Sequence, residues 1–451
     1  MTPIPFESAG EVQALETEPP AAARLDAKPL NVSRERVDPN AVDVVAKLKG
    51  AGFQAWLVGG CVRDLLLGAR PKDFDVATNA TPEQVRGLFR RSRLVGRRFK
   101  ITHVRYGRDV IEVSTFRRAP SGDLRINGNA KANGLILRDN AYGTLREDAF
   151  RRDFTVNALY YDPHEEQILD YVGGLKDIKR QRLRFIGDAR QRLREDPVRL
   201  LRAIRFQAKL GFGLDAAVED SRMVARLREI PGARLFDEFT KMFLGGYAAE
   251  AWHLLEGTPI PSVLFPATPK GTRLVQLAME NTDRRVANGQ PVTPGFLLAV
   301  LLWEDFRARV KAPHSEPGGA NGGDAAELAA QSVLADQRRI IAMPRRHSHF
   351  IQDVWLLQRD LRERRPKRVP KVLQHPKFRA AYDFLLLCAE AGLVEPAVGQ
   401  WWTDIQTASA EERDAMINAL NPAVRRRGRG RSRQGGRGRS RQGGRSKSRQ
   451  R

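Results

Sequence analysis

The chain has 451 residues, of which 41% are hydrophobic, and its formal net charge is +24. This length allows roughly three domains with a sizeable buried core, and so basic a chain is typical of proteins that meet nucleic acid or an anionic membrane surface. The two cysteines, Cys61 and Cys388, are far apart, which excludes a disulfide framework and a cysteine-based zinc site. The N-terminus lacks the pattern of a signal peptide, and the longest apolar run, Phe296–Trp303, is too short to span a bilayer. We therefore expect a soluble cytoplasmic protein.

The first elements predict a short α/β region after an unstructured start. Residues 1–37 are rich in Pro, Ala and Glu without periodicity and predict a disordered extension. A helical pattern follows, and then a short apolar strand spans Ala55–Val58. Gly59-Gly60 turns this strand into a helix over Cys61–Leu67.

Further strands complete the predicted sheet. Asp73–Val76 predicts a second strand, and the alternating runs Ile101–Tyr106 and Val110–Thr115 predict a hairpin joined at Gly107-Arg108-Asp109. The Gly- and Asn-rich stretch Ser121–Gly134 predicts a mobile loop. Residues 38–186 therefore predict one domain with a small mixed sheet.

Helical patterns dominate the remainder of the chain. Residues 187–310 and 325–420 predict two helical regions, and Lys311–Asp324 predicts a Pro- and Gly-rich linker. The helical periodicities cover Arg190–Leu227, Leu235–Leu255, Ala325–Ala342, Phe350–Arg362 and Phe378–Ala391. Residues 421–451 predict a disordered tail, because 13 basic residues and no acidic one lie between Arg425 and Arg451. The fold class is therefore α+β.

Asp73 and Asp75 are the first candidates for a functional site. On a strand, their i, i+2 spacing puts both carboxylates on one face while Phe74 points into the core. Like charges this close repel each other, and a bound cation relieves the repulsion. Glu112 lies on the predicted hairpin, where a carboxylate from a neighbouring strand could complete a two-metal site. Asp-x-Asp is also common in loops, and Glu112 could equally face solvent.

Two further segments suit a nucleoside triphosphate. At Gly59-Gly60 the missing Cβ atoms let backbone N–H groups approach phosphate oxygens at a helix start, and Arg63 follows one turn later. An ordinary strand-to-helix turn explains the same residues. The segment Arg151–Asn157 contains two arginines, an acid and an amide, which suit a triphosphate and a ribose, although a surface turn is the alternative reading.

The segment that starts at Glu195 predicts a helix with one cationic face. Pro197 suits the first helical position and Asp196 the N-cap. A stripe about 120° wide holds the basic side chains Arg199, Arg202, Arg205 and Lys209. The apolar side chains opposite are Leu200, Leu201, Ile204 and Ala208. The alternative interpretation is a basic helix face that only contacts solvent. However, arginines three residues apart repel each other, and an anionic ligand would relieve that repulsion.

These blocks together resemble the class II nucleotidyltransferases, which comprise the CCA-adding tRNA nucleotidyltransferases and the bacterial poly(A) polymerases. The resemblance covers about residues 40 to 420 and rests on Gly59-Gly60-x-Val62-Arg63-Asp64, Asp73-x-Asp75, Arg151-Arg152-Asp153-Phe154-Thr155-Val156-Asn157-Ala158 and Glu195-Asp196-Pro197-x-Arg199. The segments Leu94–Val104, Phe378–Leu386 and Trp401-Trp402 look like those of the poly(A) polymerases. The resemblance implies a palm-like nucleotidyltransferase domain over 38–186, followed by helical neck, body and C-terminal RNA-binding regions.

The resemblance also implies a role for each matching residue. Asp73 and Asp75 would hold two Mg²⁺ ions, for which Mn²⁺ could substitute, and either Glu112 or Asp153 would be the third catalytic acid. The residues implied to bind the nucleotide are Gly59, Gly60, Arg63, Arg152, Asn157, Asp196, Arg199, Arg202 and Arg205. Among these, Asp196 and Arg199 would offer hydrogen bonds to the adenine edge. The basic residues expected to contact RNA are Arg97, Arg98, Lys100, Arg425, Arg426, Arg427, Arg429 and Arg431.

The expected activity is therefore template-independent transfer of AMP from ATP to an RNA 3′ end with release of pyrophosphate. Such a polymerase would act in RNA turnover, with RNA-degradation proteins as possible partners. A CCA-adding enzyme is the alternative within the same class. A non-catalytic RNA-binding protein is the alternative of another class, and the intact acidic residues argue against it.

Overall fold

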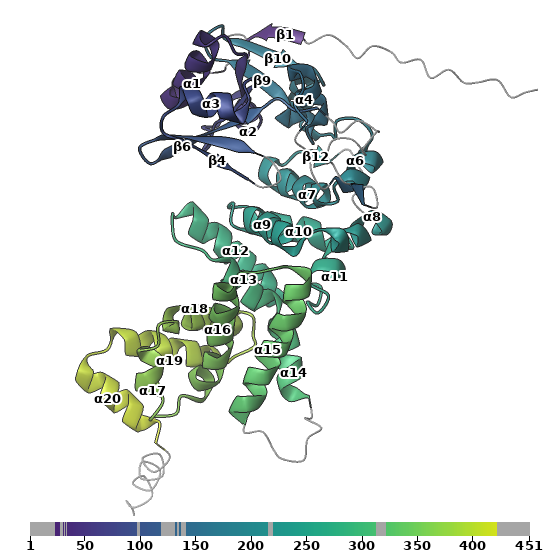
Figure 1. Ribbon diagram of the computed structural model, residues 1–451. Helices are drawn as coiled ribbons and strands as arrows, with labels where there is room; N and C mark the ends of the chain where they lie inside the picture. The colour runs from purple at the N-terminus through teal and green to yellow at the C-terminus, as the bar shows by residue number, and fades with distance from the viewer. Residues whose placement is uncertain are drawn as a thin grey trace, which may run out of the picture. The chain divides into compact units, whose positions relative to one another are not determined.

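The computed structural model describes residues 23–27, 30, 32, 34–96, 100–118, 131–132, 135–136, 141–214, 220–312 and 322–421. The chain forms two compact units, Met1–Leu227 and Arg228–Arg451. Figure 1 shows the strands gathered in the first unit and helices throughout the second. This is the α+β organisation that the sequence predicts. Among the described helices, none combines the length and hydropathy needed to cross a bilayer.

A mixed sheet forms the centre of the first unit. Within the described residues it has eight strands in the order β1-β10-β9-β2-β3-β6-β5-β4. The strands of the unit are β1 (Ala23–Asp26), β2 (Ala55–Val58), β3 (Asp75–Thr78), β4 (Ser92–Val95), β5 (Ile101–Tyr106), β6 (Asp109–Thr115), β7 (Lys131–Ala132), β8 (Leu135–Ile136), β9 (Leu159–Asp162), β10 (Gln167–Asp170), β11 (Arg182–Leu183) and β12 (Gly213–Leu214). Strands β3 and β6 run parallel, and the other pairs in the large sheet are antiparallel.

Helices cover both faces of this sheet. The helical segments of the first unit are η2 (Arg34–Arg36), α1 (Pro39–Gly50), α2 (Gly60–Leu66), α3 (Pro82–Leu88), α4 (Leu145–Arg151), η3 (Thr155–Asn157), α5 (Gly174–Lys179), α6 (Ala189–Glu195), α7 (Val198–Leu210) and α8 (Ser221–Ala225). On one face α1, α2 and α3 pack on the larger apolar core, which includes Leu48, Leu57 and Val76. On the other face Leu145 and Ala149 of α4 pack on a smaller core.

Local sequence signals explain where helix α4 begins. Helix α4 starts with a capping box, in which the Thr144 side chain accepts from the Glu147 N–H and the Glu147 carboxylate accepts from the Thr144 N–H. This cap fixes the helix register, so that Leu145 and Ala149 face the sheet and Asp148 is buried beside them. The cap therefore determines which carboxylate of the helix reaches the interior.

The second unit is helical throughout its described part. Its helices are α9 (Gly232–Phe243), α10 (Ala248–Glu256), α11 (Ile260–Leu264), α12 (Arg273–Ala287), α13 (Pro294–Leu301), α14 (Trp303–Lys311), α15 (Gly322–Ile340), α16 (Arg345–Glu363), α17 (Val369–Leu373), α18 (Phe378–Glu390), α19 (Pro396–Thr407) and α20 (Ala410–Ala419), and η4 (Arg226–Glu229) contains the division between the units. Aromatic side chains join these helices, as where Phe306 of α14 stacks on Trp355 of α16 with ring centroids 4.6 Å apart.

One predicted boundary is wrong, and two others can be compared with the structure. Ala23–Asp26 form the edge strand β1 instead of belonging to a disordered extension, because they pair with β10. The compact unit that contains the sheet extends to Leu227, whereas the domain boundary at residue 186 stays a prediction. The region Arg190–Leu227, where the sequence predicts helical patterns, contains α6, α7 and α8, and α7 begins directly after Pro197, at the helix start that the sequence indicates.

Other predictions are confirmed or fall outside the described residues. The strand Ala55–Val58 and the hairpin of β5 and β6 form as predicted, with Tyr106 paired to Asp109 across the turn. Residues 1–22, most of the predicted loop Ser121–Gly134 and linker residues 313–321 lie outside the described part. So do residues 422–451 of the tail.

Candidate active site

A row of paired residues crosses the centre of the sheet. We call it the polar row, because all of its residues except Val58 are polar. The register pairs His103 of β5 with Glu112 of β6, Glu112 with Asp75 of β3, Asp75 with Val58 of β2, and Val58 with Tyr160 of β9. Residues directly opposite each other on neighbouring strands point to the same face of a sheet. The face is the one on which α4 packs, because Val58 and Tyr160 belong to the α4 core.

The carboxylates of this row are close enough to affect each other. The pKa of Asp75 is raised to about 6, chiefly by burial and then by the Glu112 charge, while Arg152 opposes the shift and Asp73 adds to it. The Glu112 carboxylate also contacts the His103 imidazole, with Oε1 3.2 Å from Nε2. Asp75 therefore lies within electrostatic range of both Glu112 and Asp73, and their joint role in a site stays a prediction.

Asp73 differs from the prediction in its local structure. Strand β3 begins at Asp75, so Asp73 lies in the connection before the strand and is exposed. Phe74 is 5% exposed and anchors the segment in the core, as predicted. Burial of Phe74 therefore holds the two carboxylates near each other although only one belongs to the strand.

These carboxylates have the chemistry of a site for a hard divalent cation. Such cations prefer carboxylate oxygens, and Mg²⁺ in particular is often held by one or two carboxylates together with the phosphates of a substrate. In the described part of the chain, no three His, Cys, Asp or Glu side chains stand close enough together to hold a metal ion by themselves. Burial first and the Glu112 charge second raise the pKa of Asp75, and a bound cation would offset both by stabilising the charged carboxylate. The residues thus fit a cation shared between Asp73, Asp75 and a bound nucleotide.

The glycine turn lies beside Asp75. Gly59 has φ +84°, a conformation that favours glycine over other residues, and a Cβ atom there would lie 3.9 Å from Oδ2 of Asp75 and 3.7 Å from Nη1 of Arg152. Gly60 begins helix α2, and a Cβ atom on it would lie 3.5 Å from Nη2 of Arg63. The turn therefore leaves the backbone open next to one carboxylate and two guanidinium groups.

Arg63 is more buried than the sequence suggests. Its exposed fraction is 1%, and its Nη1 donates to Oδ1 of Asn157 at 2.5 Å. Its Nε and Nη2 both donate to Oδ1 of Asp64, at 2.8 and 2.6 Å. The structure thus brings together two residues predicted to bind the nucleotide, Arg63 and Asn157, and it holds the guanidinium inside the protein.

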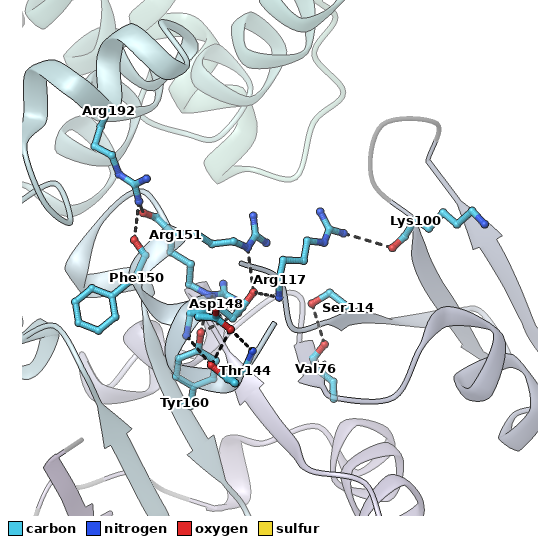
Figure 2. A network of polar contacts seen from close by, with 12 residues as sticks. Val76, Lys100, Ser114, Arg117, Thr144, Asp148, Phe150, Arg151, Tyr160 and Arg192 are labelled. Atoms are coloured by element: carbon cyan, nitrogen blue, oxygen red, sulfur yellow. Dashed lines mark hydrogen bonds and ion pairs between the residues drawn. The ribbon is translucent and has the colours of Figure 1, made fainter. Parts of the chain in front are cut away.

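Asp148 is a buried centre of hydrogen bonds (Figure 2). Its Oδ2 accepts from Nε and Nη2 of Arg152, at 3.1 and 2.8 Å, and from the Tyr160 hydroxyl at 2.8 Å. Its Oδ1 accepts from Nε of Arg151 and from the backbone N–H of Arg117, both at 3.2 Å. Burial alone would raise the pKa of Asp148, but the two arginines and the tyrosine hydroxyl outweigh it and hold the pKa at about 2.

This arrangement orients Arg152 toward the glycine turn. Nε and Nη2 are used by Asp148, and Nε also donates to the Tyr160 hydroxyl at 3.1 Å. Nη1 has no hydrogen-bond partner among the residues that the structure describes, and it is the Arg152 atom nearest to a Cβ built on Gly59. The backbone is also fixed, since Nη2 of Arg192 donates to the carbonyl oxygens of Phe150 and Arg152. The Nη1 group of Arg152 is therefore available to donate a hydrogen bond to an anionic ligand.

Asp153 has a different environment from Glu112. Arg202 of α7 binds it through Nε at 2.7 Å, and its Oδ1 accepts from the Phe154 N–H at 2.8 Å. Burial would raise the pKa of Asp153, but Arg202 and then Arg199 lower it to about 2. Asp153 is not among the charges that shift the pKa of Asp75, whereas Glu112 is. Of the two candidates for a third acid, Glu112 is thus the one beside the aspartate pair.

Helix α7 has the predicted two faces, with one exception. Leu200, Leu201 and Ile204 are buried as predicted. Phe206 is 8% exposed although it lies among the arginines. Three guanidinium groups surround its ring, with their central carbons 5.4, 5.6 and 4.3 Å from the centroid, and they belong to Arg63, Arg202 and Arg205.

The start of α7 differs from the prediction. The helix begins at Val198 with Pro197 at the N-cap position, and no side-chain hydrogen bond caps it, so the expected N-cap role of Asp196 is wrong. The Asp196 carbonyl oxygen accepts from the Arg199 N–H at 3.0 Å instead. Arg199 is held by the Arg192 carbonyl oxygen at 2.7 Å and by the Glu195 carboxylate at 3.3 Å. Asp196 and Arg199 therefore lie at one turn between α6 and α7.

The basic residues predicted to contact RNA are only partly covered by the structure. Lys100 is about half exposed and its Nζ lies 3.3 Å from the Glu83 carboxylate. The others lie outside the described residues, and these are Arg97, Arg98, Arg425, Arg426, Arg427, Arg429 and Arg431.

Sequence reasoning missed Asp148, Tyr160, His103 and Phe206. A signal existed for two of them. Asp148 lies four residues before Arg152 on a helix, which is the spacing of an ion pair, and His103 lies on a strand predicted to pair with that of Glu112. Tyr160 and Phe206 carried no such signal, because each reaches the site through tertiary packing.

Comparisons with known proteins identify relatives of the chain. The chain matches the model of the Poly A polymerase head domain over residues 55–184, that of the probable RNA and SrmB-binding site of polymerase A over 220–270, and that of the polymerase A arginine-rich C-terminus over 318–437. It is 45% identical to Poly(A) polymerase I of Haemophilus influenzae over 411 residues, which cover 88% of this chain and 89% of that protein. It is 44% identical to Poly(A) polymerase I of Escherichia coli O6:H1 over 415 residues, with the same coverage.

A solved structure shows the same fold. The apo form II of a CCA-adding enzyme superposes with a TM-score of 0.58 and 21% identity, covering 86% of this chain and 88% of that one. At this identity the likeness concerns the fold alone.

Proposed function

The chain belongs to the family of the bacterial poly(A) polymerases and is a template-independent polynucleotide adenylyltransferase, and we propose that it transfers AMP from ATP to RNA 3′ ends through the polar row and the glycine turn described above. The observation that carries the proposal is the adjacency of Asp75, Glu112 and the Gly59 turn, with the uncommitted Nη1 of Arg152 beside them. Carboxylates next to donors for a triphosphate are what in-line transfer of a nucleotidyl group requires.

Asp73 and Asp75 are proposed to hold divalent metal, with Mg²⁺ as the natural ion and Mn²⁺ as a substitute. A pair of such ions, when bound, lowers the pKa of the RNA 3′-hydroxyl and neutralises the charge that develops on the leaving pyrophosphate. Glu112 is proposed as the third acid in preference to Asp153. The reason is that the negative charge of Glu112, and not that of Asp153, contributes to the raised pKa of Asp75. His103 would orient the Glu112 carboxylate through their contact at 3.2 Å.

The triphosphate is proposed to lie against the glycine turn. Backbone N–H groups at Gly59-Gly60 and the Nη1 group of Arg152 would donate to phosphate oxygens, and Asp148 would keep Arg152 in place. Asn157 would contact the ribose. Arg63, which is buried against Asn157, would position that amide instead of binding phosphate directly.

Base selection is proposed for the turn between α6 and α7. Asp196 offers acceptors and Arg199 offers donors, and together these complement the edge of an adenine. Arg202 and Arg205 would add positive charge next to the phosphates, with Arg202 anchored by Asp153. A protein template of this kind replaces the template strand of other polymerases.

RNA is the proposed acceptor, with Lys100 and the arginine-rich tail among its contacts. Polyadenylation in RNA turnover, a cytoplasmic location and RNA-degradation proteins as partners remain predictions from the resemblance. The proposal is tested by incubating an unstructured RNA primer with ATP and measuring both AMP incorporation and released pyrophosphate. We expect one pyrophosphate for each AMP added, and an activity that is lost in Glu112→Gln but retained in part by Asp153→Asn. Full activity of Glu112→Gln would overturn the assignment of the third acid, and absence of extension by the wild-type protein would overturn the function.

A further inference from the structure

The second unit contains a cavity of about 330 Å³ that the proposed chemistry does not use. Its walls come from α12, the connection over Pro291–Thr293, the start of α13, Phe350 of α16 and the segment Pro376–Asp383. Ligand sites in proteins are usually of about 300 Å³ or more. The cavity is therefore of a size for one nucleotide and too small for a longer stretch of strand.

Two aromatic rings line this cavity. Phe296 and Phe350 are both only partly buried, so each offers part of its ring to a ligand. Phe296 packs edge-on against Phe384, with centroids 6.1 Å apart and an interplanar angle of 71°, which fixes its orientation. The ammonium group of Lys377 lies 5.7 Å from the Phe350 centroid. Partly exposed aromatic rings are the surfaces on which nucleobases stack.

Three cations and a single acid lie around these rings. Arg285, Lys377 and Arg379 line the cavity together with Asp383. The Asp383 carboxylate is 3.0 Å from Nε of Arg379 and 3.9 Å from Nη1 of Arg285, so one acid restrains two arginines and leaves an excess of positive charge. Guanidinium and ammonium groups arranged in this way suit a phosphate.

An uncommitted amide completes the cavity. Asn281 of α12 lines the wall and is partly buried, and its side-chain amide has no hydrogen-bond partner among the residues that the structure describes. The neighbouring Thr282 hydroxyl is already used, because it donates to the Ala278 carbonyl oxygen at 2.8 Å. An asparagine amide provides one donor and one acceptor side by side, which is the pattern that pairs with adenine N7 and N6.

From these features we propose that the cavity binds an adenine nucleotide, with the base against Phe296 and Phe350, its edge read by Asn281, and its phosphate on Arg285, Lys377 and Arg379. The inference rests on the proposed function, since a polymerase that makes poly(A) meets adenine nucleotides both in its RNA product and as the free nucleotide. A site of this kind would retain the product and favour strands that already end in adenosines.

The test compares binding of fluorescent twelve-nucleotide oligo(A) and oligo(U) by anisotropy, with the full chain, and adds binding of free AMP by calorimetry. The variants are Asn281→Ala and Arg379→Glu, and Arg339→Glu is the matched control, since Arg379 and Arg339 have side chains 72% and 81% exposed and each pairs with an aspartate on its own helix. Losing a bidentate contact to adenine should weaken oligo(A) binding by Asn281→Ala about tenfold and change oligo(U) binding little. Arg379→Glu should weaken both oligonucleotides, and Arg339→Glu neither.

The outcomes separate this site from the proposed activity. Weaker binding by Asn281→Ala of AMP, or of oligo(A) with oligo(U) little changed, supports the site, and the probe affected identifies whether the nucleotide comes from RNA or from the free pool. Unchanged binding of both probes in Asn281→Ala, or equal loss of oligo(A) and oligo(U), would overturn it. Primer extension by the wild-type protein judges the proposed function independently, so a wild-type enzyme that extends RNA while the variants bind normally would refute the cavity alone.

Discussion

Replacing Asp148 by asparagine should impair both the use of ATP and the stability of the fold. The change keeps the shape of the side chain but removes the charge that faces Arg152 and Arg151. The amide also places its own N–H groups where the carboxylate accepted hydrogen bonds. We expect the guanidinium of Arg152 to lose its fixed orientation toward the glycine turn.

The stability cost follows from the pKa of Asp148. In the folded protein this pKa is about 2, against an ordinary value of 3.8, which corresponds to about 2 kcal/mol of folding free energy at neutral pH. Because the folded pKa is depressed, the contribution is complete above about pH 4 and fades as the pH falls toward about 2. The difference in unfolding free energy between wild type and Asp148→Asn should therefore shrink across that range.

The catalytic cost is of similar size if Arg152 contacts the triphosphate. A charge-assisted hydrogen bond lost from the transition state costs about 1.5–3 kcal/mol, or roughly a ten- to hundred-fold loss in kcat/KM for ATP. The assay measures single-nucleotide extension of an RNA primer against ATP concentration at neutral pH, together with thermal unfolding.

A matched control separates stability from positioning. Asp162 is also buried and paired, with Lys49, but it lies on β9 away from the glycine turn. Asp162→Asn should also lower stability, because it removes the buried carboxylate that pairs with Lys49, and it should leave kcat/KM for ATP within about twofold of wild type. If Asp148→Asn and Asp162→Asn gave the same kinetics, the positioning role of Asp148 would be refuted.

Three further predictions concern the metal, the base and the tail. Asp73→Ala and Asp75→Ala should each lower primer extension by at least about 10³-fold while circular dichroism shows an intact fold, and near-wild-type activity of either variant would contradict the metal assignment. Asp196→Ala or Arg199→Ala should reduce the preference for ATP over other nucleotides, since a lost buried hydrogen bond to a ligand costs about 1–3 kcal/mol; unchanged selectivity would leave these residues a structural role only. Deleting residues 425–451 should weaken RNA binding and flatten its salt dependence in filter-binding assays without altering single-addition rates at saturating RNA, whereas identical salt slopes would exclude an RNA-binding role for the tail.

The sequence predicts the parts of the site that depend on local order. Gly59-Gly60 and the hairpin that carries Glu112 could be located because glycine turns and alternating strands have clear local patterns. Phe74 between two aspartates correctly predicted a core anchor flanked by carboxylates. Register and parallel pairing of β3 with β6 could not be read from the chain, so the placement of Glu112 directly opposite Asp75 emerges only in the structure.

Tertiary packing determines the remaining features. The buried state of Arg63 depends on Asn157 and Phe206, which come from distant segments. The extent of the first unit to Leu227 follows from contacts such as the ion pair of Arg202 with Asp153, and no local signal reports such a pair. Sequence patterns therefore located the candidate chemistry, and packing decided which side chains face a ligand.

The most direct test of the account is extension of one unstructured RNA primer with each of the four nucleoside triphosphates separately, in the presence of Mg²⁺. The account predicts a long ladder with ATP, little product with the other three, and no requirement for tRNA. Addition of C and A to tRNA alone, stopping after three nucleotides, would contradict it in favour of a CCA-adding enzyme, and binding without any extension would contradict it in favour of a non-catalytic RNA-binding protein.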